Sequence, residues 1–520
     1  MNTTNTTRPS IPAIGIDLGT TFSVLSRLDE RSRPVTVVNA EGDLLTPSVV
    51  LFDGNDVVVG KEALKAVVSE SSRVAECSKR DIGQQVYHKV LEGKSYPPEV
   101  IEAFILNKLR VDAAKQMGPF SKVVITVPAY FDEVRRKATQ DSGYMAGFEV
   151  LDIINEPTAA AVAFGFRKGY LDPAGGAATP QHILVYDLGG GTFDVTVMQI
   201  KGTKFKALAT DGDVRLGGYD WDQRLVDLAA EEFLRQHRAD PRRDSVAAGK
   251  LWRECEDAKR TLSVRQKAAV ACDFGGVSAR IEISRAQFEE ATQDLLDRTR
   301  FTTTQALKAA RLEWRELDRV LLVGGSTRMP MVRDMLRQLS GKEPDDSVAA
   351  DEAVAHGAAL QASLILAQQQ GLPPVFKIRN VNSHSLGVVG VDPQTMLRRN
   401  VTLIPRNTTL PVSAKRTFRT TNADQRSILV EIVEGESPSP DNCTLIGRCE
   451  VRHLPHNLPA QSRVEVLFHY EPNGRLNVRV AVPGTDRRVA TEIVRVNSLS
   501  KEHLDGWRKF ISGLPATDYH

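Results

Sequence analysis

The sequence lacks the features of a disulfide-stapled, secreted or membrane-spanning protein. Its 520 residues contain five cysteines with no Cys-x-x-Cys pair: Cys77, Cys255, Cys272, Cys443 and Cys449. An odd number of scattered cysteines argues against a disulfide framework or a zinc site and favours a reducing compartment. No run of 18 apolar residues occurs, and the polar N-terminus has no apolar signal segment. We therefore expect a cytoplasmic protein without a membrane span.

Neither sign of charge is in excess, and two common nucleotide motifs are missing. Lys and Arg number 67 against 65 Asp and Glu, so charge gives no reason to expect nucleic acid or an anionic membrane as a partner. The P-loop pattern fails because His88 stands where its first glycine belongs. No Gly-x-Gly-x-x-Gly opens a helix after a strand, so nothing in the sequence supports a Rossmann dinucleotide site.

What the sequence does contain is a glycine-rich turn between two strand-like segments. Residues 186–194 read YDLGGGTFD, and the apolar and β-branched residues on both sides predict a hairpin. The glycines at 189–191 carry no Cβ, so backbone N–H groups could approach an anion closely. Asp187 and Asp194 bracket the turn, and carboxylates beside a phosphate site favour a hard cation such as Mg²⁺.

A similar segment occurs earlier in the chain. Residues 14–21 read IGIDLGTT and precede the strand-like FSVL. Either segment alone could be an ordinary hairpin turn rich in Asp and Gly. The repetition instead indicates two related lobes that face each other across a nucleotide.

The length suggests about three to four compact units. Alternating strand and helix patterns predict α/β lobes, and period-2 alternation further on predicts a separate antiparallel β domain, a sandwich or a barrel. The predicted parts are a disordered tail (1–11), two α/β lobes (12–172 and 181–372) separated by a Gly- and Pro-rich loop, a linker (373–381), the β domain (382–496) and a C-terminal helical segment (497–520).

The C-terminal segment contains a short amphipathic helix. Ser500 can cap it, and Leu504, Trp507 and Ile511 fall on one face. We expect this face to pack on the β domain.

Over about residues 12–495, the chain resembles the seventy-kilodalton heat-shock chaperone family of the DnaK type. The matching segments, in order, are 15–21 (GIDLGTT), 124–131 (VITVPAYF), 153–161 (IINEPTAAA), 186–194 (YDLGGGTFD), 323–330 (VGGSTRMP) and 351–355 (DEAVA). The resemblance implies an α/β, two-lobed, actin-like ATPase domain followed by an antiparallel β-sandwich that grips extended, unfolded peptide segments.

The resemblance also implies roles in binding ATP or ADP with Mg²⁺, and K⁺ is a further candidate ion. Asp17 and Asp194 would hold magnesium through water, and Glu156 would join the same water network. Lys79 would position the attacking water and support charge on the γ-phosphate, which is where phosphoryl-transfer catalysis mostly arises. The residues expected around the phosphates are Gly19, Thr20, Thr21, Gly189, Gly190, Gly191 and Thr192. Those expected around the adenosine are Glu256, Lys259 and Ser263 on a helix, with Gly324, Gly325, Arg328 and Asp351 opposite.

From the residues alone, Lys79 and the charged helix positions would read as exposed surface. Pro128 and Arg136 match the family's nucleotide-responsive switch pair. In the β domain the positions that match the family's peptide channel are Val388, Val391, Phe418, Thr421, Ile428, Val430 and Ile432, and the resemblance implies that Ile428 lies in the central pocket. Alternating apolar residues in a sandwich also suit a plain core.

The chain departs from the family pattern in four ways. The linker carries Lys377 and Arg379, with Asn380 at the usual aspartate position. Asp152 replaces an arginine that meets J-domain partners, which suggests a dedicated co-chaperone. Short connections at 83–97 and 274–278 leave the nucleotide-exchange factor undetermined.

The sequence also stops where a helical lid would continue, which predicts faster peptide release. Together these traits resemble the short, specialised bacterial members of the HscC kind.

Three other functions share parts of this pattern. A small-molecule kinase of the same ATPase fold would not need residues 381–495. An actin-like filament former would sediment in the presence of ATP. An ATP-binding regulator or scaffold of the same family, with weak or uncoupled peptide binding, is the main alternative.

Overall fold

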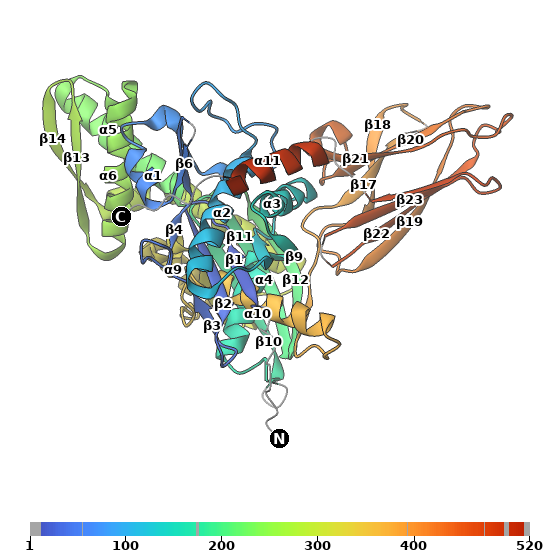
Figure 1. The fold of residues 1–520 in the computed structure, drawn as a ribbon, viewed down its shortest axis with the longest axis horizontal. Coiled ribbons are helices and arrows are strands. Elements are labelled where there is room, and N and C mark those ends of the chain that lie inside the picture. Colours follow the sequence, from blue (N-terminus) through green and yellow to red (C-terminus); the bar gives the residue numbers. More distant parts are fainter. Residues whose placement is uncertain are drawn as a thin grey trace.

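The computed structural model describes residues 12–54, 56–172, 176–392, 394–472, 474–492 and 499–513. The predicted tail, residues 1–11, lies outside them. The described residues form two α/β lobes, with a β-rich domain to one side (Figure 1).

The first lobe is built on a mixed six-stranded sheet of order β3-β2-β1-β8-β9, in which β4 pairs with β2. A smaller sheet of order β6-β5-β7 lies in the same lobe. The strands are β1 (Ile14–Asp17), β2 (Phe22–Leu28), β3 (Pro34–Thr36), β4 (Thr46–Pro47), β5 (Val49–Asp53), β6 (Asp56–Val59), β7 (Val74–Glu76), β8 (Lys122–Val127) and β9 (Glu149–Asn155). The helices are α1 (Lys61–Ala66), α2 (Pro98–Met117), α3 (Glu133–Met145) and α4 (Glu156–Arg167).

The second lobe has a five-stranded sheet of order β15-β10-β11-β12-β16 and a separate hairpin, β13-β14. Its strands are β10 (Ala177–Leu188), β11 (Phe193–Gly202), β12 (Lys204–Asp213), β13 (Lys267–Phe274), β14 (Val277–Ser284), β15 (Arg319–Val323) and β16 (Lys377–Arg379). Its helices are α5 (Gly218–His237), α6 (Ser245–Val264), α7 (Arg285–Ala291), α8 (Gln293–Ala309), α9 (Pro330–Ser340) and α10 (Ala353–Gln369).

The two main sheets share one topology. In each, a central strand pairs antiparallel with the next strand and parallel with a later one: β1 with β2 and β8, and β10 with β11 and β15. This correspondence confirms the prediction, made from the repeated Asp-Leu-Gly segments, of two related lobes.

Helix α10 ties the lobes together. A Cβ on Gly15 of β1 would lie 2.1 Å from the backbone nitrogen of Ala359, and one on Gly357 would lie 1.8 Å from the carbonyl oxygen of Ala159 on α4. The backbones therefore touch directly, and a larger residue at either glycine would push α10 away. Helix α10 therefore packs on the first lobe, although it follows the second lobe in the sequence.

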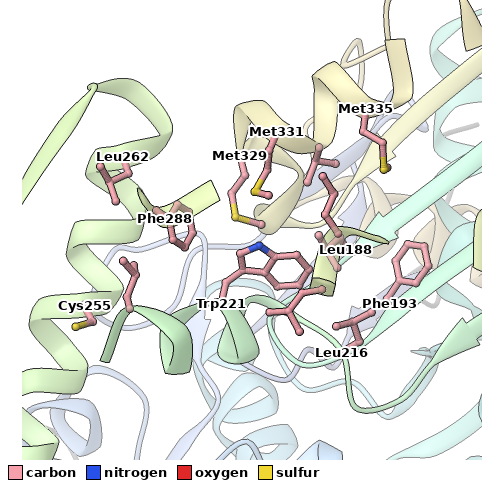
Figure 2. Packing of buried hydrophobic residues seen from close by; sticks show 14 of the residues in the cluster. Leu188, Phe193, Leu216, Trp221, Cys255, Leu262, Phe288, Met329, Met331 and Met335 are labelled. Atoms are coloured by element: carbon pink, nitrogen blue, oxygen red, sulfur yellow. The ribbon is translucent and has the colours of Figure 1, made fainter. Parts of the chain in front are cut away.

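A large apolar core supports the second glycine-rich turn. Trp221 on α5 is fully buried, and Figure 2 shows it close to Leu188, Leu216, Met329 and Met331. Because Leu188 directly precedes the turn at 189–192, this packing fixes the position of the turn.

The C-terminal domain consists of two antiparallel four-stranded sheets, of orders β18-β17-β20-β21 and β19-β22-β23-β24. Its strands are β17 (Leu386–Val391), β18 (Arg398–Ile404), β19 (Val412–Arg419), β20 (Ile428–Glu434), β21 (Thr444–Val451), β22 (Arg463–Tyr470), β23 (Leu476–Ala481) and β24 (Arg488–Glu492). Side chains of both sheets, such as Ile432 and Phe468, enter one core. The predicted antiparallel β domain is confirmed.

The predicted linker forms a strand. β16 pairs parallel with β12 at the edge of the second-lobe sheet, with Ile378 opposite Phe205. Ile378 packs on the core, whereas Lys377 and Arg379 are exposed. Because alternate residues of a strand face opposite sides, both basic residues fit at this edge without being buried.

The C-terminal helix, α11 (Lys501–Gly513), does not pack on the β domain, so that prediction is wrong. It lies against α2 and α3 of the first lobe (Figure 1). Ile511 is fully buried there, and Trp507 contacts Tyr96 with ring centroids 6.1 Å apart. The Tyr144 hydroxyl donates to Asp505 at 2.5 Å. The sequence showed an apolar helix face, but periodicity does not say which surface covers it.

Among the described residues, no helix combines the length and apolar character that a membrane span requires.

We predict that Ile511→Ala releases α11 from the first lobe. Loss of its buried side chain should weaken docking by about 2 kcal/mol, and amides of residues 501–513 should exchange with solvent about thirtyfold faster. The exposed Lys509→Ala is the matched control and should change little. Equal exchange in both variants would contradict the packing.

Candidate active site between the lobes

Two turns meet at the base of the site. The first joins β1 to β2, and Asp17 is the last residue of β1. The second joins β10 to β11, where Asp187 pairs with Asp194 and the N–H of Gly189 donates to the carbonyl of Thr192 at 3.0 Å. Both predicted hairpins are therefore present.

The turns face each other in contact. A Cβ on Gly190 would lie 1.9 Å from Oγ1 of Thr21, and one on Gly191 would lie 2.4 Å from Cγ2 of Thr20. Only glycine leaves room for this approach. The backbone N–H groups and threonine hydroxyls of both lobes are thereby brought to one place.

A cavity of about 870 Å³ opens between the lobes above these turns. This volume lies in the range of small-molecule sites, about 300–1,000 Å³. The predicted residues that line it are Asp17, Gly19, Thr20, Thr21, Lys79, Glu156, Gly189, Gly190, Thr192, Glu256, Lys259, Ser263, Gly324, Gly325, Arg328 and Asp351. Gly191 and Asp194 do not line the cavity, and Asp194 is almost completely buried behind it.

Lys79 and Glu156 form a buried ion pair in the cavity wall. Nζ of Lys79 donates to Oε1 of Glu156 at 2.6 Å, and their side chains are only 3% and 9% exposed. Burial acts to lower the pKa of Lys79, but Glu156 and Asp17 outweigh it and raise that pKa. Lys79 therefore stays cationic, unlike the exposed lysine that the sequence alone would suggest.

The carboxylates around Lys79 carry more negative charge than it can balance. Burial, followed by repulsion from Glu156, raises the pKa of Asp17 to about 7 and that of Asp194 to about 8. The same two causes raise the pKa of Asp187 well above its ordinary value. Asp17 accepts a hydrogen bond from Thr126 at 3.2 Å, and Asp194 accepts one from the Tyr130 N–H at 2.8 Å. A bound cation would favour the ionised form of all three acids.

Among the residues that the structure describes, no group of three His, Cys, Asp or Glu side chains is placed to hold a metal ion. Mg²⁺ commonly keeps several waters and binds phosphate oxygens with few carboxylates. The carboxylate excess and the N–H-rich turns fit such an ion bound together with phosphates.

Helix α6 forms one side of the cavity mouth. Lys259 donates to Asp222 at 2.6 Å and to the carbonyl of Gly218 at 3.0 Å. Glu256 is paired with Arg253 and Arg260. The predicted adenosine residues therefore form a fixed charged wall rather than a freely solvated helix face.

The wall opposite follows β15. Arg328 pairs with Asp351 at 2.5 Å. Gly324 has a φ of 82°, and a Cβ there would lie 2.4 Å from the carbonyl oxygen of Leu188. The glycine is needed for both the backbone conformation and the close packing against β10.

Sequence reasoning missed several residues at the mouth. Tyr219 and Trp252 lie with ring centroids 4.4 Å apart, and Arg80 lies over Tyr219 at 5.0 Å. Arg253 pairs with both Glu76 of the first lobe and Glu256 of the second. The one available signal was spacing, since Trp252 precedes Glu256 by one helical turn; the partners in the other lobe have no signal in the sequence.

The predicted switch pair lies near the β domain. The carbonyl of Pro128 accepts from the N–H of Phe131 at 3.1 Å, and Arg136 donates to Asn155 at 2.5 Å. Between them, Tyr130 donates its N–H to Asp194, and its carbonyl accepts from Nε2 of His384 at 2.9 Å. The sequence predicted roles for Pro128, Arg136 and Asp194, but it gave no indication of the bonds that Tyr130 makes to Asp194 and His384.

The predicted channel residues of the β domain fall into two groups. Val388, Ile428, Val430 and Ile432 are buried in the core, and Phe418 is partly buried against it. Val391 and Thr421 are exposed.

Comparison with known proteins adds an independent finding. The family model described as Hsp70 protein matches residues 13–92 and 85–510. A protein of Thermus thermophilus named chaperone protein DnaK is 39% identical over 523 residues, which cover 95% of this chain and 82% of that protein. Proteins of the same name from Metamycoplasma hominis and Thermotoga neapolitana are each 38% identical, over 95% and 94% of this chain and 81% and 82% of their own length. With the paired lobes, the facing turns and the β-rich domain, these matches show that the chain belongs to the Hsp70 chaperone family.

Proposed function

We propose that this protein is an ATP-driven chaperone, which hydrolyses ATP between its two lobes and binds extended apolar peptide segments in its β domain. The observation that supports the proposal is a pair of hydrogen bonds made by the backbone of Tyr130. Its N–H donates to Asp194 in the site, and its carbonyl accepts from His384 of the β domain. The cytoplasmic location and the likeness to HscC-type members belong to the same proposal.

In this proposal the two facing turns bind the phosphates. Backbone N–H groups at 189–192 and the hydroxyls of Thr20, Thr21 and Thr192 would surround the anionic oxygens. Asp17 and Asp194 would hold Mg²⁺ through water molecules. The ion would neutralise charge on the phosphates, and it would allow Asp17 and Asp194 to remain ionised at neutral pH.

Lys79 would carry the hydrolytic step. It is a buried cation held at 2.6 Å by Glu156, so its direction is fixed before a nucleotide binds. A preorganised charge of this kind stabilises a transition state with little reorganisation. Glu156 would orient Lys79 and, with Asp17, would fix the water beside it.

The mouth of the cavity would hold the adenosine. Lys259, Glu256 and Ser263 on α6 would contact it on one side, with Gly324, Gly325 and the Arg328–Asp351 pair on the other. These groups lie away from Lys79, so they would affect nucleotide affinity more than hydrolysis.

In the β domain we propose a sandwich with a peptide channel at the end where Val391 and Thr421 are exposed. Val388, Ile428, Val430 and Ile432 would form its floor as part of the core, and Phe418 its side. Burying one apolar peptide side chain against this floor would contribute about 2 kcal/mol. Backbone hydrogen bonds would provide the part of binding that does not depend on sequence.

Further contacts hold the β domain against the ATPase lobes. Arg406 pairs with Asp211 at 3.1 Å, and Asn407 accepts from the N–H of Thr210 at 2.9 Å. Glu434 is buried and accepts from the N–H of Glu133, the first residue of α3, at 3.0 Å. These contacts support a domain-docked state that a change at Asp194 could favour or disfavour.

The departures from the family pattern also have local partners. Asn380 accepts from the Thr158 hydroxyl at 3.0 Å, and Asp152 accepts from Gln361 at 3.0 Å. The docked linker therefore keeps a polar contact without the usual aspartate. Because Asp152 adds a negative charge where the family has an arginine, we propose a dedicated J-domain co-chaperone.

We predict that Lys79→Ala and Lys259→Ala separate hydrolysis from binding. Lys79→Ala should lower the single-turnover rate of ATP hydrolysis about 100-fold or more, because one preorganised charge is lost. Lys259→Ala should weaken ATP affinity while leaving that rate within about threefold of the unaltered protein. Equal hydrolysis by the unaltered protein and Lys79→Ala would exclude the proposed role of Lys79.

The proposal as a whole is tested by the dissociation rate of a fluorescent apolar peptide, measured with ADP and then with ATP. We expect ATP to speed release about tenfold, which corresponds to a release barrier about 1.4 kcal/mol lower. His384→Ala should reduce this effect, whereas hydrolysis in the absence of peptide should stay similar. A peptide dissociation rate that is the same with ADP and with ATP would indicate an uncoupled regulator or scaffold. If no peptide binds at all, the chaperone proposal is wrong.

A further inference from the structure

The β domain differs in charge from the rest of the chain. Residues 382–496 contain 14 arginines and one lysine against 11 acidic residues, although the whole chain is nearly neutral. Arginine is the cation that pairs with carboxylates through two parallel hydrogen bonds. The positions of these arginines therefore bear on which peptides the domain would bind.

The excess lies on one face. Along β19, β22, β23 and β24, the side chains that alternate with the core residues point outward. The basic residues on this outer face are Lys415, Arg419, Arg463, Arg479 and Arg488. Among the outward side chains that the structure describes, the only acid is Glu465, and Lys415 pairs with it at 2.7 Å.

Within this basic face, Arg419 and Arg463 are the clearest case of positive charge that no described acid balances. They are directly opposite in the β19–β22 register, and both are exposed. Within the part of the chain that the structure describes, neither has a carboxylate at ion-pair distance; Arg419 donates only to the carbonyl of Gln461, at 3.2 Å. Like charges placed directly opposite in a sheet destabilise it.

Arginines on and beside the other sheet, by contrast, form ion pairs with acidic residues. Arg398 and Arg448 both pair with Glu431, and Arg452 pairs with Glu450. These three arginines are each paired with an acid, whereas Arg419 and Arg463 lie opposite each other without one among the described residues.

The unbalanced pair lies beside the proposed channel. Arg419 directly follows Phe418 and precedes the loop that contains Thr421. The N–H of Thr420 donates to the carbonyl of Ser462 at 3.0 Å, and the N–H of Ser462 donates to the Thr420 hydroxyl at 3.0 Å. The two arginines therefore lie next to the loop at the proposed rim of the channel, where a bound segment would continue.

We propose that Arg419 and Arg463 select clients in which an apolar segment is followed by acidic residues. The inference rests on the proposed peptide-binding function and specifies its substrate class. The client's carboxylates would supply the counter-charges that the sheet lacks. A single-stranded nucleic acid fits less well, because binding of such strands relies on aromatic side chains that stack on bases. On the outward positions of β19, β22 and β23, the only ring is that of His469.

Two fluorescent peptides with the same apolar core, Ala-Leu-Leu-Val-Leu-Ala, test the proposal; one continues with four glutamates and the other with four glutamines. With the full chain and ADP at low salt, we expect the glutamate peptide to bind about tenfold more tightly. The preference should shrink at 0.5 M NaCl because salt screens exposed charges. Arg419→Gln/Arg463→Gln should abolish it, whereas the matched control Arg452→Gln, an exposed arginine already paired in the protein, should retain it.

Each other outcome decides something different. Equal binding of both peptides, unchanged in the double variant, overturns the inference and leaves the chaperone proposal standing. Failure of both peptides to bind counts against the chaperone proposal itself. If a single-stranded oligonucleotide binds through these arginines and the glutamate peptide shows no preference, the face is a nucleic-acid site and the inference is wrong.

The double variant should also be slightly more thermostable than the unaltered protein, since it removes the like-charge pair. This measurement requires no ligand. A lower melting temperature would show that the arginines stabilise the sheet, and it would remove the reason to assign them a client.

Discussion

The backbone of Tyr130 is hydrogen-bonded on both sides, and the link between the cavity and the β domain depends on it. Its N–H is held by the carboxylate of Asp194 at 2.8 Å, and its carbonyl is held by Nε2 of His384 at 2.9 Å. The first bond changes in strength with the charge on Asp194, because a carboxylate accepts more strongly than a carboxylic acid. A cation or phosphate that alters this charge would therefore change the hydrogen bond to Tyr130, the residue whose carbonyl is bonded to His384 of the β domain.

Buried charge explains why the site is built as it is. Four carboxylates, those of Asp17, Glu156, Asp187 and Asp194, lie near the buried cation Lys79. Burial, and then repulsion from Glu156, destabilises the ionised forms and raises the pKa of the other three acids. The lobes hold these groups in place through contacts that only glycine permits, at positions 15, 190, 191 and 357. Rigid packing of this kind can keep such a cluster together until a ligand balances it.

The sequence predicted those parts of the molecule that depend on local pattern. The two hairpins, the α/β lobes and the antiparallel β domain follow from strand alternation and glycine turns, and the cavity gathers most of the predicted site residues. Contacts between distant segments could not be predicted in this way. The apolar face of α11 was visible, but its packing against α2 and α3 was not, and nothing near Tyr130 pointed to His384. Periodicity describes one element at a time, whereas these contacts depend on how two elements meet.

We propose that the nucleotide site and the peptide site are coupled, and thermodynamic linkage requires such coupling to act in both directions. The most direct test is the affinity for a non-hydrolysable ATP analogue, measured with and without a saturating apolar peptide. If the two sites are coupled, peptide should weaken analogue binding by the same factor by which the analogue weakens peptide binding, about tenfold. An analogue affinity that peptide leaves unchanged would show that the two sites are not coupled, however tightly each ligand binds alone.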